Sequence, residues 1–254
     1  MMGWTLAAVL VIVALGGFIK GFSGFGPSLV LGGLLLFFYD PVEIVPVLAL
    51  LSFMMNTFIL VEQWRRTRHD PASFAFRPET LVALLAGTTI GVHALVELPV
   101  GVVKVIFGVL IIAFLALYFR RDGRLMRVRV PARLQHGAIG LVAGFFSGLI
   151  NTNGPPIVLY ALYKGLDKER FVGVITRFFL VADLLAIGLF LWRGLYGAAQ
   201  VSYFAWFAPI AAAGFLGGRW LRRHASERAF HKAVVVFLLL IAAKTVVDGV
   251  MLTA

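Results

Sequence analysis

Two short stretches place glycine and polar residues inside otherwise apolar segments, GFSGFGPS at 21–28 and SGLINTNGPP at 147–156. A helix in lipid can be interrupted only where protein or a water-filled cavity satisfies the freed backbone groups. The helix that restarts after a break exposes N–H groups and partial positive charge, which together favour an anion. We therefore predict that the two breaks face each other within a membrane and hold a small anion.

The predicted site combines backbone N–H groups with neutral side-chain donors from both breaks. Glycine lets a ligand approach the backbone, and proline in a first helical turn costs no hydrogen bond. In the alternative interpretation, the glycines only permit close packing and the prolines only kink helices. The predicted binding residues are Ser23, Gly24, Phe25, Gly26, Pro27, Ser147, Asn151, Thr152, Asn153, Gly154, Pro155 and Arg177.

Several charged residues lie within or beside apolar segments, where a charge is costly and usually functional. Arg177 is predicted to neutralise the anion, with snorkelling to the interface as the alternative. Asp183 is a candidate proton carrier, and Asn56 falls within one residue of its equivalent in the first half of the chain. Alternatively, Asp183 is a static partner of Arg177 or of a helix end. Lys20 immediately precedes the first break, and we expect it to reach the interface rather than the anion.

The composition indicates a polytopic membrane protein. The chain has 254 residues, of which 61% are hydrophobic and only 14% charged, whereas about a quarter of the residues of a soluble domain are charged. The formal net charge of +11 is distributed over short loops, so we expect no nucleic-acid partner. The absence of cysteine excludes disulfides, thiolate nucleophiles and cysteine metal sites. No hydrolytic or metal-binding motif is recognisable, so we expect neither an enzyme nor a cofactor.

The predicted fold is an all-α membrane protein built from two inverted repeats, residues 1–122 and 123–254, within one integrated transmembrane domain. Each repeat has a broken helix pair, either re-entrant or two tilted crossings, followed by three transmembrane helices. The first apolar run, 4–19, is expected to belong to the fold rather than to a removed signal. The predicted helical segments are 4–19, 29–38, 44–61, 81–96 and 102–119, then 134–150, 157–163, 171–191, 201–217 and 233–251.

Matching residues support the repeat. Gly87 and Gly91 match Gly214 and Gly218 at a separation of 127 residues, and both pairs have the spacing that lets helices approach closely. Residues before the breaks match at 124 and residues after them at 128, which predicts that the second break is four residues longer.

Positive charge predicts the orientation of the repeats. Four loops, 62–78, 120–133, 164–170 and 218–232, contain 18 of the 23 Lys and Arg residues. Such loops stay in the cytoplasm, which inverts the second repeat relative to the first and places both termini outside.

These motifs resemble those of the TauE/SafE family of sulfite exporters. The resemblance covers nearly the whole chain and depends on GFSGFGP at the first break, on GFFSGLINTNGPPIVLY from Gly144 to Tyr160, and on GFLGGRWL from Gly214. It implies transport of small anions such as sulfite, sulfoacetate or other sulfonates. Pro27 and Ser28 depart from the more usual glycine-rich continuation, and residues 151–153 are predicted to tune selectivity.

The residues and the resemblance together predict a secondary transporter in the cell membrane that works by alternating access, with proton coupling as a further candidate property. Its predicted partners are a small anion and the lipid bilayer, and a homo-oligomer is left open. One rival hypothesis is an anion channel, which would show flux without saturation or coupling. Another is a membrane assembly factor that transports nothing.

Overall fold

Regular structure in this protein is helical throughout the part of the chain that the computed structural model describes. The described residues are 2–24, 27–66, 77–119, 132–152, 154, 157, 168–221 and 251. The helices within them are α1 (Met2–Ser23), α2 (Pro27–Leu35), α3 (Pro41–Arg66), α4 (Pro78–Glu97), α5 (Val100–Phe119), α6 (Ala132–Ile150), α8 (Lys168–Trp192) and α9 (Ala198–Leu221). The predicted all-α class is confirmed. The predicted segments 157–163 and 233–251 lie almost entirely outside the described residues.

Proline determines where several helices begin. α2, α3 and α4 each have proline as their first residue, where the missing N–H costs nothing and the fixed φ favours the helix. The start of α3 at Pro41 makes that helix longer than the predicted 44–61, and α3 also continues to Arg66. Pro46 lies inside α3 without ending it.

Among the residues that the structure describes, five helices are long and apolar enough to cross a membrane, namely Trp4–Phe22, Pro41–Trp64, Pro78–Glu97, Gly173–Trp192 and Ala198–Leu221. α2 differs from them because it has only nine residues. Nine residues span roughly 14 Å, which is about half of a bilayer's hydrocarbon core. α2 is therefore a half-length helix that begins within the molecule, after the first break.

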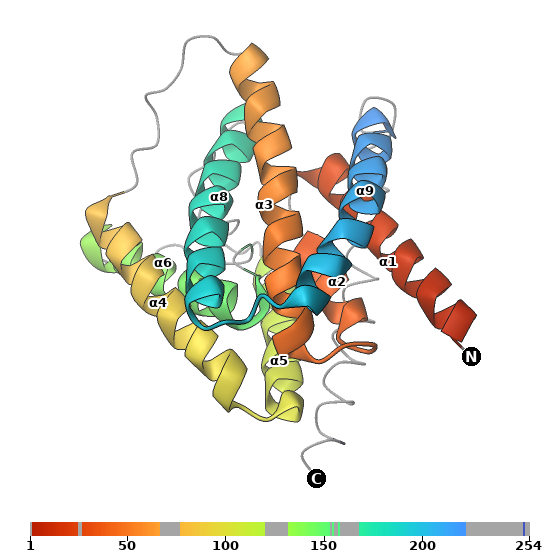
Figure 1. Ribbon diagram of the computed structural model, residues 1–254. Coiled ribbons are helices and arrows are strands. Elements are labelled where there is room, and N and C mark those ends of the chain that lie inside the picture. Colours follow the sequence, from red (N-terminus) through yellow and green to blue (C-terminus); the bar gives the residue numbers. More distant parts are fainter. Residues whose placement is uncertain are drawn as a thin grey trace.

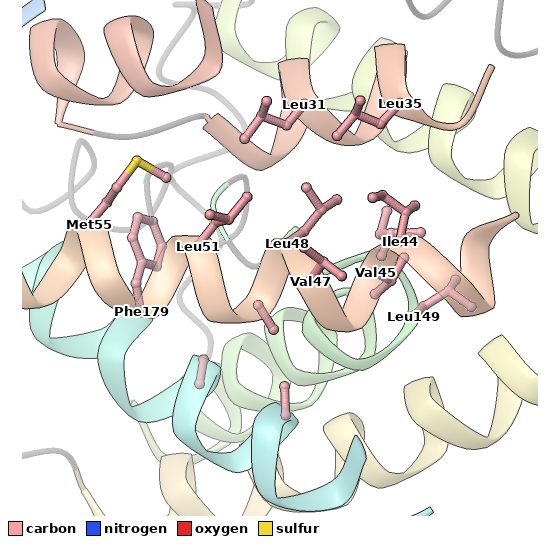
Figure 2. Packing of buried hydrophobic residues seen from close by; sticks show 14 of the residues in the cluster. Leu31, Leu35, Ile44, Val45, Val47, Leu48, Leu51, Met55, Leu149 and Phe179 are labelled. Carbon is pink, nitrogen blue, oxygen red and sulfur yellow. The ribbon is translucent and has the colours of Figure 1, made fainter. Parts of the chain in front are cut away.

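The helices associate in three main pairs. α3 and α8 lie side by side, and they are flanked by α4 with α6 on one side and by α1 with α9 on the other (Figure 1). Each pair joins one helix from the first half of the chain with one from the second half. Between them lies the apolar core, in which Leu31 and Leu35 of α2 face Ile44 and Leu48 of α3 (Figure 2).

Glycines bring the backbones of the flanking pairs into direct contact. A Cβ atom built on Gly87 of α4 would lie 2.1 Å from the carbonyl oxygen of Leu141 on α6. A Cβ atom built on Gly214 of α9 would likewise lie 2.1 Å from the carbonyl oxygen of Ala14 on α1. Because no side chain fits in so short a distance, only glycine allows these helices to pack as they do.

These two contacts correspond to each other. Gly87 and Gly214 differ by 127 in residue number, and so do their partners Ala14 and Leu141. The same separation relates Asn56 of α3 to Asp183 of α8. The reciprocal contacts, of Gly17 with Ala211 and of Gly144 with Leu84, follow the same rule. Two further sets of contacts show the same separation. The contact of Gly21 with Phe215 corresponds to that of Gly148 with Thr88, and the contact of Gly91 with Phe145 corresponds to that of Gly218 with Phe18.

The separation of 127 holds in the first helix of each half, so the predicted change from 124 to 128 is wrong. The glycines of α6 recur at every fourth residue, at 140, 144 and 148. An alignment of the two halves by identical residues can therefore be shifted by about one helical turn and still pair glycine with glycine. The opposite membrane orientation of the halves and the division between 122 and 123 stay predictions.

Candidate anion-binding site

The two predicted breaks are real interruptions of helices, and both helices end in the same way. α1 ends at Ser23, and Gly24 follows with φ +79°; α6 ends at Ile150, and Asn151 follows with φ +49°. A left-handed residue after the last turn is a common helix stop, and asparagine tolerates it better than most side chains do. Gly24 and Asn151 also differ by 127 in residue number, as the contacting glycines do.

The breaks lie next to each other. Asn151 Nδ2 is 3.5 Å from Ser28 Oγ, in the first turn of α2. At this distance the hydrogen bond is weak, but it places a side chain of the second break at the N-terminal end of the helix that follows the first. Asn151 and Thr152 are both buried.

A carboxylate lies beside the breaks, at the contact between α3 and α8. Asp183 is fully buried, and its Oδ2 accepts hydrogen bonds from Ser52 Oγ and Asn56 Nδ2, both at 2.8 Å. Asn56 and Asp183 are separated by 127 residues, the same separation that relates the glycine contacts of the two flanking helix pairs. The hydrogen bonds of Asp183 are therefore made with α3, and not with Arg177 as in the alternative interpretation.

Lys20 points inward, which makes the expectation that it reaches the interface wrong. Its side chain is 1% exposed, and its Nζ lies 4.9 Å from the centroid of the Phe179 ring. The ammonium also interacts electrostatically with Asp183. The physical reason is packing: Gly17 and Gly21 hold one side of α1 against α9, and Lys20 lies about 80° further round that helix, where it is directed toward Phe179 of α8.

The Phe179 ring connects this lysine with the second break. A Cβ atom on Gly154 would lie 3.8 Å from the Cζ atom of Phe179, which is ordinary van der Waals contact. Gly154 is helical and follows the interruption at Asn151 and Thr152. Lys20 from the first half and Gly154 from the second therefore lie beside the same aromatic ring.

Several buried side-chain oxygens of α3, α6, α8 and the second break lack a hydrogen-bond partner among the residues that the structure describes. They are Asn56 Oδ1, Ser147 Oγ, Asn151 Oδ1, Thr176 Oγ1 and Asp183 Oδ1. Folded proteins leave few such atoms unsatisfied, because each costs about 1–3 kcal/mol. They lie on α3, on α8 and at the end of α6, and of the five only the hydroxyls of Ser147 and Thr176 can donate a hydrogen bond to an anion.

A family model described as sulfite exporter TauE/SafE matches residues 9–245 of this chain. The chain belongs to the TauE/SafE family. Membership in this family identifies a multi-pass membrane transporter of sulfur-containing anions. A search of curated proteins and a search of solved structures gave no match.

The structure of this TauE/SafE protein locates part of the predicted site. Ser147, Asn151 and Thr152 are buried, and Gly24 and Gly154 lie at the ends of the interruptions. Arg177 is half-buried on α8. Phe25, Gly26, Asn153 and Pro155 lie outside the described residues, and the side chains of Ser23 and Pro27 are not described.

Four residues of the region were not predicted as part of the site, namely Lys20, Ser52, Thr176 and Phe179. Ser52 precedes Asn56 by one helical turn and Thr176 precedes Asp183 by two, so both pairs share a helix face. This spacing is a signal that could have identified Ser52 and Thr176. Phe179 has no such signal, because phenylalanine is common in an apolar helix.

Proposed function

We propose that this protein is a secondary transporter that moves sulfite, sulfoacetate or another small organic anion across the cell membrane by alternating access. The anion binds between the two breaks, beside Lys20. The observation that supports this most is the buried ammonium of Lys20 at a helix interruption, in a region where the hydroxyls of Ser147 and Thr176 have no hydrogen-bond partner among the described residues. A buried ammonium needs a negative partner. Asp183 takes that part in the empty region, and a transported anion can replace it and leave again.

Each part of the region has a role in recognition. The Lys20 ammonium supplies charge, and the hydroxyl of Ser147 and the amide of Asn151 supply hydrogen bonds. The N-terminus of α2 adds backbone N–H groups and its dipole. An oxyanion such as sulfite or a sulfonate presents several acceptor oxygens, which matches a set of donors arriving from different directions. Arg177 is proposed to screen the bound charge from its half-buried position on α8.

The helix pairs provide a route to alternating access. Backbone contact at glycines makes α1 with α9, and α4 with α6, two stiff units. Each unit includes one of the helices that end at a break. We propose that these units rock against α3 and α8, so that the anion faces one side of the membrane and then the other. Asp183, with Asn56, is the proposed proton site that couples this movement to a gradient.

The proposed orientation follows the positive charges. The basic loops lie in the cytoplasm, both termini lie outside, and the second repeat is inverted relative to the first. Reaction of single cysteines, introduced near each terminus of this cysteine-free chain, with a membrane-impermeant thiol reagent tests this orientation. Labelling in intact cells is expected at both ends, and labelling only after lysis would refute it.

Flux of sulfite into proteoliposomes tests the function. We expect saturable uptake that falls at least tenfold in Lys20→Gln, while Lys104→Gln, a partly buried lysine on α5, behaves as wild type. No flux of sulfite or any sulfonate by folded protein would refute the proposal, as would full activity in Lys20→Gln. Flux that never saturates and cannot be driven by a gradient would instead identify a channel.

A further inference from the structure

We propose that Lys20 and Asp183 act as one charge-balanced unit that admits a single monovalent anion together with a single proton, so that transport is electroneutral. This inference rests on the proposed function and specifies its coupling. It depends on which charges the buried region contains.

The described residues contain two fully buried charged side chains, Lys20 on α1 and Asp183 on α8. Arg177, also on α8, is only half-buried, and we count it with the solvent-accessible charges rather than with the buried pair. From α3, the side chains that face Asp183 are the neutral Ser52 and Asn56. Tyr196, between α8 and α9, interacts electrostatically with Asp183 and donates a hydrogen bond to the carbonyl oxygen of Pro46. Burial raises the pKa of Tyr196, and Asp183 adds to this effect, so its phenol stays neutral.

At each of these two places in the repeat, only one of the two corresponding residues is charged. At the separation of 127 residues that the glycine contacts follow, Lys20 corresponds to Ser147 and Asp183 corresponds to Asn56. The backbone confirms the first equivalence, because Gly24 N–H bonds the Lys20 carbonyl just as Asn151 N–H bonds the Ser147 carbonyl. The equivalent positions are neutral, so the pair contributes one positive and one negative charge and no more.

A buried region of low dielectric strongly disfavours net charge. With one proton shared between them, Lys20 and Asp183 are neutral as a pair, whichever of the two holds that proton. A monovalent anion alone would leave the region with a charge of −1. One added proton makes both groups protonated, the pair becomes +1, and the anion balances it.

The geometry identifies an atom for the added proton. Asp183 Oδ2 already accepts from Ser52 and Asn56, whereas Oδ1 has no hydrogen-bond partner in the described part of the chain. Protonation at Oδ1 keeps both existing hydrogen bonds. It also removes the negative charge that competes with the incoming anion for Lys20. Anion and proton therefore enter together and leave together.

Methanesulfonate is a suitable probe, because it keeps a single charge at every pH used and any pH effect then belongs to the protein. Its uptake into proteoliposomes would be measured with an internal pH dye while valinomycin and potassium set the membrane potential. We expect a proton-to-anion ratio of one and a rate that does not change with the potential. Anion flux that responds to the potential, or that moves no protons, would refute the inference and leave the proposed function standing. No flux of any anion would refute the proposed function itself.

Asp183→Asn provides a second test, with Asp40→Asn, at an exposed position, as its control. Without Asp183 the ammonium of Lys20 has no balancing carboxylate in the empty region, so we expect proton-coupled anion flux to fall at least tenfold. Proton-coupled flux in Asp183→Asn equal to that of Asp40→Asn would refute the inference. Gel filtration establishes that each variant is folded. If Asp183→Asn does not fold, the wild-type proton ratio and potential dependence still decide.

Discussion

A methyl group added at Gly144 tests the close contact between α4 and α6. The Cβ atom of Gly144→Ala would lie 2.2 Å from the carbonyl oxygen of Leu84 and 2.9 Å from the amide nitrogen of Thr88. Ordinary van der Waals contact begins at 3.4 Å. The two helices must therefore separate by about 1 Å at this point, because a backbone carbonyl cannot rotate out of the way as a side chain can.

The expected cost follows from two opposing effects. Overpacking of this kind costs roughly 1–3 kcal/mol, while alanine gains up to about 1 kcal/mol over glycine in a helix. We expect Gly144→Ala to lose about 1–2 kcal/mol of stability, which lowers the melting temperature by a few degrees. Gly17→Ala should lose a similar amount, since its Cβ atom would lie 2.1 Å from the carbonyl oxygen of Ala211 in the equivalent contact.

Thermal unfolding in detergent, followed by tryptophan fluorescence, measures these changes. Gly137→Ala is the matched control, because it lies on the same helix and its added Cβ atom would meet nothing within 4 Å. We expect this control to be neutral or slightly stabilised. Equal stability of Gly144→Ala and Gly137→Ala would refute the close contact, and a loss for Gly144→Ala without one for Gly17→Ala would refute the equivalence of the two contacts.

Two further predictions concern buried polar groups. Lys20→Gln and Asp183→Asn each leave the other charge buried alone, so each is expected to lower the free energy of unfolding by about 3–5 kcal/mol. Denaturation of the double variant should show a loss of stability well below the sum of the two single losses. Additive losses would contradict this. Tyr196→Phe removes the hydrogen bond to Pro46 and is expected to cost about 1 kcal/mol at neutral pH. Because burial raises the pKa of Tyr196 in the folded state, its contribution is fully present below about pH 10, the unfolded pKa, and is lost as pH rises toward the folded pKa. Melting temperatures from pH 8 to 11 should thus fall more steeply for wild type than for Tyr196→Phe, and parallel curves would contradict this assignment.

Much of the architecture could be predicted from sequence because lipid constrains it. Glycine, proline and polar residues within an apolar segment can persist only where a helix is interrupted inside protein, and both interruptions occur where they were predicted. The relation between Asn56 and Asp183 was also visible to within one residue, since few polar residues occur in these spans. The structure adds that the two side chains bond to each other.

The direction of Lys20 could not be predicted, because it depends on the neighbours of α1 rather than on α1 itself. A lysine near the end of an apolar helix can snorkel to the interface or turn inward. The contacts of Gly17 and Gly21 with α9 decide between these options, and they involve residues nearly 200 positions away in the chain. The same long-range contacts recur at a separation of 127 residues, which a comparison of identical residues alone could not distinguish from a shift of one helical turn.

Anomalous scattering from bound selenite would test the central claim most directly. Selenite has the pyramidal shape and charge of sulfite, and selenium can be located without ambiguity in a crystal of the intact protein. We predict one strong selenium peak between the two breaks, with its oxygens within hydrogen-bonding distance of Lys20 Nζ and close to Ser147 and Asn151. A peak only at the protein surface, or none near Lys20 at saturating selenite, would contradict the account.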